Sequence, residues 1–134
     1  MSSPLPVTAA VLERGGLILL AQRSRGALAG YWEFPGGKLE EGEAPEVCLR
    51  RELREELGID AAIGVFLIST VHHYPQFSVE LQVYRAVIER GEPVAQVHSA
   101  LVWVPLKELR FYQLAPADWP VVDLLEQQAK MLNR

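Results

Sequence analysis

The sequence has one cysteine, no apolar run of membrane-spanning length and no cluster of basic residues. Cys48 alone cannot form an internal disulfide and fits a reducing compartment, so we expect a cytoplasmic protein. A membrane-spanning helix needs ~20 apolar residues, and no stretch approaches that length. The first residues lack the basic and apolar regions of a signal peptide. We therefore expect no membrane partner.

Positive charge is also scarce, with 13 Lys and Arg against 17 Asp and Glu, a net charge of −4. Proteins that bind DNA or RNA usually present a basic face, because neutralising phosphates dominates their affinity. We therefore expect no nucleic-acid polymer as a partner. A free nucleotide can still bind an acidic site if a divalent cation bridges its phosphates to that site.

The 134 residues, of which 49% are hydrophobic and 22% charged, suit one domain with its own core. Two helices are expected. In the second, one face would be formed by the side chains of Val121, Leu125, Ala129 and Leu132. Arg14-Gly15-Gly16 predicts a hairpin turn. Strands and helices together indicate an α/β fold with a mixed sheet. The hydrophobic pattern predicts strands at residues 7–12, 17–20, 32–34, 62–70, 77–88 and 100–104, and helices at residues 44–57 and 120–132.

Three glutamates share one face of the first expected helix. Glu52, Glu55 and Glu56 are spaced i, i+3, i+4, so their carboxylates fall within about a quarter-turn. Like charges at this spacing repel, and oxygen ligands converging on one spot suit Mg²⁺ or Mn²⁺. The alternative is a solvated acidic face offset by neighbouring arginines.

The residues before this helix favour a metal site over a plain acidic surface. Glycines at 36, 37 and 42 would let the backbone turn sharply and bring a loop beside the carboxylates. Glu43 follows this loop directly.

The same stretch resembles the defining motif of the Nudix hydrolases. Gly37, five residues, Glu43, seven residues and then Arg51-Glu52-Leu53-Arg54-Glu55-Glu56-Leu57-Gly58-Ile59 match it at every fixed position. Further segments resemble the MutT branch, its CTP pyrophosphohydrolases included, among them residues 7–11, 19–23, 32–38, 100–103 and 114–118. The resemblance implies one Nudix domain over residues 1–134, an α/β/α sandwich around a mixed β-sheet.

The resemblance also implies roles for individual residues. The metal, Mg²⁺ with Mn²⁺ as a possible substitute, would be held by Glu52, Glu55 and Glu56 and by the backbone carbonyl of Gly36 or Gly37. Among the catalytic residues, Glu43 would orient or supplement the site and Arg51 would hold nearby carboxylates. The expected substrate-binding residues are Arg23, which would contact phosphate, Phe34, Lys38 and Asp118.

The implied activity is hydrolysis of a nucleoside triphosphate to a monophosphate and pyrophosphate, with 8-oxo-dGTP or a related nucleotide as substrate. CTP or 5-methyl-dCTP is an alternative. ADP-ribose is another, because Pro75 lies 16 residues after Ile59, a spacing found in ADP-ribose hydrolases. A non-catalytic nucleotide sensor, from a different class, also stays open. Either a monomer or a homodimer is compatible with the sequence.

One departure from the MutT pattern concerns the general base. MutT-like enzymes often carry a glutamate in the loop before the strand at residues 100–104, and this chain has Val97 at the matching position. The base is then Glu52 or Glu56, unless His98 or another residue compensates.

Asp118 is the expected reader of the nucleobase, although it also lies where it could cap the second helix. An ionised aspartate only accepts hydrogen bonds, which suits the amino group of cytosine or the N1–H and N2–H₂ edge of a guanine-type base. Phe34, beside the glycines, is the aromatic residue expected to line the base pocket. For Trp32 and Tyr84 we expect packing rather than base stacking.

Overall fold

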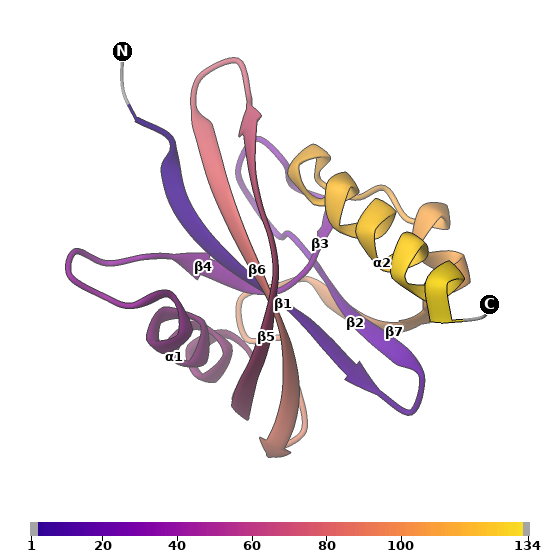
Figure 1. Ribbon diagram of the computed structural model, residues 1–134. Coiled ribbons are helices and arrows are strands. Elements are labelled where there is room, and N and C mark those ends of the chain that lie inside the picture. Colours follow the sequence, from indigo (N-terminus) through magenta and orange to yellow (C-terminus); the bar gives the residue numbers. More distant parts are fainter. Residues whose placement is uncertain (1–2, 133–134) are drawn as a thin grey trace.

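A computed structural model describes residues 3–132 of the chain. Seven strands, two α-helices and two short 3₁₀-helices follow one another in that range (Figure 1). Their order is β1 (Leu5–Arg14), β2 (Leu17–Gln22), β3 (Trp32–Glu33), β4 (Gly36–Lys38), α1 (Pro45–Leu57), β5 (Asp60–His73), β6 (Ser78–Arg90), β7 (Ala100–Pro105), η1 (Leu106–Phe111), η2 (Pro116–Asp118) and α2 (Trp119–Leu132).

The strands form a mixed sheet in the order β3-β2-β1-β6-β5, with β4 paired to β1 and β7 paired to β2. Only β1 and β6 run parallel; the other pairs are antiparallel. The expected hairpin joins β1 and β2, where Gly15 and Gly16 take positive φ angles of 60° and 79°. Because β1 pairs with β2, β4 and β6, it joins the strands on the β2 side of the sheet (β3 and β7) to those on the β6 side (β5).

Each face of the sheet carries one hydrophobic core and one helix (Figure 1). Alternate residues of β1 point to opposite faces, so Ala9 and Val11 pack in the core with α2 while Ala10 and Leu12 pack in the core with α1. This arrangement is the α/β/α sandwich that the resemblance implied.

Helix α1 follows its prediction closely. Leu49, Leu53 and Leu57 are fully buried, and Gly58 ends the helix in the left-handed conformation with φ 71°. Pro45 occupies the first turn, so the helix starts one residue later than expected.

Helix α2 departs from its prediction at the C-terminal end. Val121 and Leu125 are buried, together with Val122, but Leu132 is 85% exposed and Ala129 is only half-buried. The expectation that Leu132 continues the buried face is wrong, because the side chains at the end of the helix, Met131 included, are open to solvent.

The segment after Pro35 was expected to be a loop and is strand β4, paired with β1. Of the three glycines expected to turn the chain, only Gly42 has a positive φ, 77°. Gly36 and Gly37 are needed for close approach instead: a Cβ on Gly36 would collide with the Thr8 carbonyl, and one on Gly37 with the Glu52 carboxylate.

The remaining differences concern boundaries. Strand β5 extends beyond its predicted range at both ends, whereas β6 starts one residue later and ends two residues later than predicted. The two strands pair with each other through three register shifts. The 3₁₀-helices η1 and η2 have too few residues to show a hydrophobic period. Within residues 3–132, no helix is long and apolar enough to cross a membrane.

The packing of β4 predicts different costs for two glycine substitutions. We expect Gly36→Ala to lower the free energy of unfolding by more than ~3 kcal/mol, because its methyl group meets rigid backbone. Gly42→Ala is the control: open space surrounds it, so only its left-handed φ is strained, at a cost of about 1 kcal/mol. Urea denaturation of both variants measures this, and equal losses would contradict the close approach of β4 to β1.

Candidate active site

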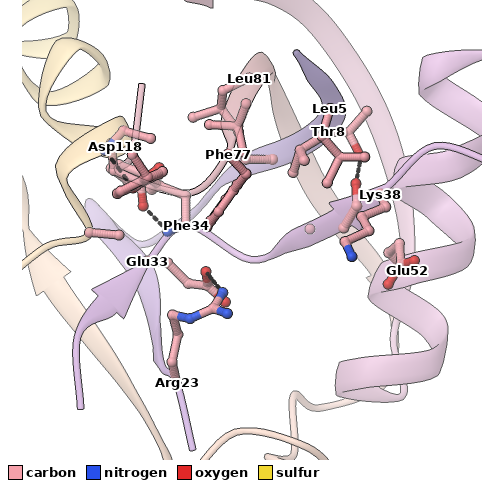
Figure 2. A pocket seen from close by; sticks show the side chains of 18 of the residues that line it. Leu5, Thr8, Arg23, Glu33, Phe34, Lys38, Glu52, Phe77, Leu81 and Asp118 are labelled. Atoms are coloured by element: carbon pink, nitrogen blue, oxygen red, sulfur yellow. Dashed lines mark hydrogen bonds and ion pairs between the residues drawn. The ribbon is translucent and has the colours of Figure 1, made fainter. Parts of the chain in front are cut away.

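A cavity of about 820 Å³ opens between the sheet, α1 and the segment that leads into α2. Asp118 and Phe34 lie at one end and Lys38 and Glu52 at the other, with the Arg23–Glu33 pair between them (Figure 2). The cavity therefore brings together residues from β1, β3, β4, α1, β6 and η2 with Arg23, which follows β2. Of the predicted residues, it is lined by Arg23, Phe34, Gly36, Gly37, Lys38, Glu52, Glu56 and Asp118.

The three glutamates of α1 do not have equal access to the cavity. Glu52 and Glu56 line it, and the side chain of Glu52 is only 14% exposed. Glu55 lies outside the lining, with 59% of its side chain exposed. Glu43 also lies outside it, although its side chain is only 11% exposed.

Arg51 binds the carboxylates around the cavity into one network. Its Nε and Nη2 donate to Glu43 at 2.8 and 2.9 Å, and its Nη1 donates to Glu52 at 3.0 Å and to Glu55 at 3.2 Å. The hydrogen bonds from Arg51 lower the pKa of Glu43 to about 2. Arg51 therefore contacts three of these carboxylates at once.

Glu56 is the carboxylate that Arg51 does not neutralise. Its Oε1 is buried and has no hydrogen-bond partner among the described residues. Burial, followed by the charges of Glu52 and Glu33, raises the pKa of Glu56 to about 8. Burial likewise raises the pKa of Glu52. The surrounding residues thus do not fully stabilise the ionised forms of Glu52 and Glu56.

These residues fit a hard divalent cation. The unpaired Oε1 of Glu56 needs a partner, and a cation would also relieve its repulsion from Glu52. The Gly37 carbonyl accepts hydrogen bonds from the Thr8 hydroxyl (3.2 Å) and the Cys48 thiol (3.7 Å), so as a ligand it would have to give up one of these donors. No three acidic, His or Cys side chains of residues 3–132 are already gathered as a ready metal site.

Arg23 is held by an acidic residue that the sequence did not single out. Arg23 Nη1 donates to Glu33 Oε1 at 2.9 Å, and the ring Nε2 of His98 contacts Glu33 Oε2 at the same distance. The His98 side chain is 5% exposed. The only sequence signal for Glu33 was a charged residue between two aromatic residues in a short strand.

Asp118 and Phe34 meet at the other end of the cavity. The backbone N–H of Phe34 donates to Asp118 Oδ2 at 3.2 Å, so this carboxyl joins β3 to the start of α2. The Phe34 side chain is only 2% exposed and belongs to the core, which leaves little of its ring for stacking on a base. Burial, and then the charge of Glu33, raises the pKa of Asp118 well above its usual range. We expected an ionised carboxylate, whereas this environment favours the protonated form.

Tyr74 also lines this end of the cavity and was missed in the sequence. Its hydroxyl accepts a hydrogen bond from the backbone N–H of Ala117 at 3.1 Å. Its ring stacks on Phe77, which is 45% exposed, with a centroid distance of 5.1 Å. Trp32 and Tyr84 pack as expected, Trp32 edge-on against Tyr112 and Tyr84 within the core beneath α1.

Comparison with known proteins gives the family. The NUDIX domain model matches residues 3–125. The chain belongs to the Nudix family. It is 42% identical over 120 residues to the CTP pyrophosphohydrolase of Escherichia coli K12, covering 89% of each chain. It is also 41% identical over 116 residues to the putative 8-oxo-dGTP diphosphatase 2 of Mycobacterium tuberculosis H37Rv, covering 84% of this chain and 81% of the relative.

A solved Nudix structure extends the likeness to the fold. The MutT Nudix hydrolase of Burkholderia pseudomallei superposes with a TM-score of 0.84 at 32% identity, covering 92% of this chain and 98% of the other. The chain is therefore a MutT-like Nudix hydrolase, and both the α/β fold and the family were predicted from the sequence.

The uncompensated charge of Glu56 predicts a pH-dependent stability. Because its pKa is raised to about 8 in the folded state, the metal-free protein loses stability as pH rises from the unfolded pKa, near 4.5, through 8. We expect Glu56→Gln, which cannot ionise, to raise the free energy of unfolding at pH 8 by ~2–4 kcal/mol in EDTA.

Below pH 5 the two proteins should differ little, and added Mg²⁺ should stabilise the unsubstituted protein more than the variant. Chemical denaturation at pH 5 and pH 8, with EDTA or Mg²⁺, measures both effects. A Glu56→Gln protein less stable than the parent at pH 8 in EDTA would contradict a costly buried charge.

Proposed function

We propose that the protein is a Mg²⁺-dependent pyrophosphohydrolase, with Mn²⁺ as a substitute, that converts a nucleoside triphosphate to a monophosphate and pyrophosphate. One observation carries the proposal: the carboxylates of Glu52 and Glu56 share one cavity with Arg23 and with the buried Asp118. The cavity thus offers a cation site, a phosphate-binding group and a polar group for a base.

The residues divide into binding and orienting groups. Glu52 and Glu56, with the carbonyl of Gly36 or Gly37, would hold the cation, and the exposed Glu55 would join them only by leaving Arg51. When bound, the cation neutralises phosphate charge and acidifies a water molecule. Arg23 and Lys38 bind phosphate oxygens, while Arg51 keeps Glu52 and Glu43 oriented.

The reaction needs no covalent nucleophile. A water oxygen forms a bond to the β-phosphorus while the bond from that phosphorus to the oxygen bridging it to the α-phosphate breaks. The bridging oxygen leaves with the nucleoside monophosphate, and the water oxygen stays on the pyrophosphate. The proton released by the water goes to a carboxylate of the site.

Glu56 is the better candidate for that carboxylate. Glu52 already accepts a hydrogen bond from Arg51, whereas Glu56 has an unpaired oxygen in the interior of the site. With Glu56 as the base, the enzyme needs no glutamate at the position of Val97 and no replacement for it.

The nucleobase would bind where Asp118, Tyr74 and Phe77 surround the cavity. 8-oxo-dGTP is the first candidate substrate, in line with the name of the Mycobacterium relative. CTP is the second, because a protonated Asp118 both donates and accepts, as the N3 and amino group of cytosine require.

The direct test measures kcat/KM with Mg²⁺ for 8-oxo-dGTP, dGTP, CTP, dCTP, 5-methyl-dCTP and ADP-ribose, with pyrophosphate and phosphate assayed separately. We expect one preferred triphosphate, release of pyrophosphate, and a loss of at least ~100-fold in Glu56→Gln. Cleavage of ADP-ribose alone, or of nothing, would refute the proposal and favour an ADP-ribose hydrolase or a nucleotide sensor.

The protonation of Asp118 makes a separate prediction. Asn also donates and accepts, so we expect Asp118→Asn to keep kcat/KM for the preferred triphosphate within ~10-fold, whereas Asp118→Ala should lose ~100-fold or more. An Asn variant as impaired as the Ala variant would show that an ionised carboxylate reads the base.

A further inference from the structure

A second, smaller recess of about 230 Å³ lies between the end of β2, helix α1 and the segment before β7. It shares Arg23, Glu33 and Glu56 with the main cavity, and His98 closes it from the other side. We call it the His98 recess; it is lined by Arg23, Ser24, Arg25, Glu33, Glu56, Val97 and His98.

The His98 recess gathers buried polar atoms that lack partners. Among the described residues, Arg23 Nε, Glu56 Oε1 and His98 Nδ1 are the buried side-chain nitrogen or oxygen atoms without a hydrogen bond. All three belong to side chains that line this one recess. A buried unpaired polar atom costs about 1–3 kcal/mol, so three in one recess indicate a site whose partners arrive with a ligand or with water.

His98 is fixed by its surroundings before any ligand binds. Ser24 Oγ donates to the Val97 carbonyl at 2.7 Å, and Ser99 N donates to the Gln22 carbonyl at 3.0 Å. These bonds tie the backbone on both sides of His98 to the end of β2. The backbone that carries His98 is therefore anchored on both sides.

The hydrogen bond between His98 and Glu33 has a defined donor and acceptor. A carboxylate only accepts, so Nε2 of His98 must carry the proton and donate to Glu33 Oε2. Arg23 Nη1 occupies the other oxygen, Oε1. Glu33 is thus held from both sides. Removing His98 would leave Oε2 of Glu33 without its donor, beside the carboxyl group of Glu56.

We propose that His98 is a positioning residue: acting through Glu33, it fixes the guanidinium of Arg23 in the orientation that binds substrate phosphate. This inference rests on the proposed function. It gives His98 a role other than that of a replacement base, since its donor nitrogen is committed to Glu33 and the proton acceptor is Glu56.

Three substitutions separate the two ring nitrogens of His98. Gln places an amide N–H₂ close to the position of Nε2 and keeps the bond to Glu33. Asn reaches only the position of Nδ1, and Leu removes both groups. Arg110→Gln is the control, because it removes an arginine of η1 that hydrogen-bonds to α2 and lies outside the cavity and the recess.

The first measurement is independent of turnover. The Arg23 Nε–H signal of ¹⁵N-labelled protein, assigned by its loss in Arg23→Lys, reports the order of this side chain through its heteronuclear NOE. We expect the order to fall in His98→Leu and His98→Asn and to stay in His98→Gln and Arg110→Gln. An ordered Arg23 in folded His98→Leu would overturn the proposal.

The second measurement is kcat/KM for the preferred triphosphate. We expect a loss of ~10-fold or more, mainly through KM, in the Leu and Asn variants and recovery to within ~3-fold in His98→Gln. In an Arg23→Ala background, His98→Leu should cost less than ~2-fold.

Two kinetic results would count against the proposal. Independent losses in the double variant would show that His98 does not act through Arg23, and rescue by Asn instead of Gln would assign the role to Nδ1. Absence of turnover in the unsubstituted protein would refute the proposed function, and the order of Arg23 would then decide this inference by itself.

Discussion

The active site depends on the close packing of a charged helix face against a strand that begins with two glycines. Glu52 lies so near Gly37 that any Cβ there would meet its carboxylate, and Gly36 lies against the backbone of Thr8. Like-charged carboxylates would not hold this position by themselves. The buried leucines on the adjacent face of α1 anchor the helix to the sheet, and their burial offsets the electrostatic cost. Packing on one face therefore forces repelling groups together on the other.

The protein neutralises only part of the charge gathered in this way. Arg51 forms hydrogen bonds with Glu43, Glu52 and Glu55, so the outer part of the cluster is satisfied within the chain. Glu56, further inside, keeps an unpaired buried oxygen and a pKa raised to about 8 by burial and by neighbouring carboxylates. An arginine hydrogen-bonded to Glu56, as Arg51 is to Glu52, would have stabilised the fold and closed the site to a cation. The unsatisfied carboxylate is thus a stability cost located where the proposed chemistry needs a ligand or a base.

Local sequence patterns predicted much of this arrangement. They could not predict contacts between residues that are distant in sequence. The spacing of Glu52 and Glu56 along α1 follows from helical geometry, so the sequence was sufficient to place both on one face. Strand β4 was taken for a loop because Gly36 and Gly37 have no side chains to show alternation. The contact between His98 and Glu33 spans 65 positions, and nothing local in either segment signals it. The raised pKa of Asp118 was also missed, because it depends on burial rather than on residue type.

Glu33 links the two ends of the cavity electrostatically. Its charge adds to burial in raising the pKa values of both Glu56 and Asp118. Arg23 opposes this effect at both groups, because its positive charge lowers both pKa values. If Arg23 shifts part of its interaction from Glu33 to a phosphate, the field of Glu33 at Asp118 grows, which favours the protonated carboxyl further. Phosphate binding at one end would then strengthen the hydrogen-bond donor that faces the base at the other. A triphosphate held at both ends benefits from this coupling, whereas a free base or a free pyrophosphate does not.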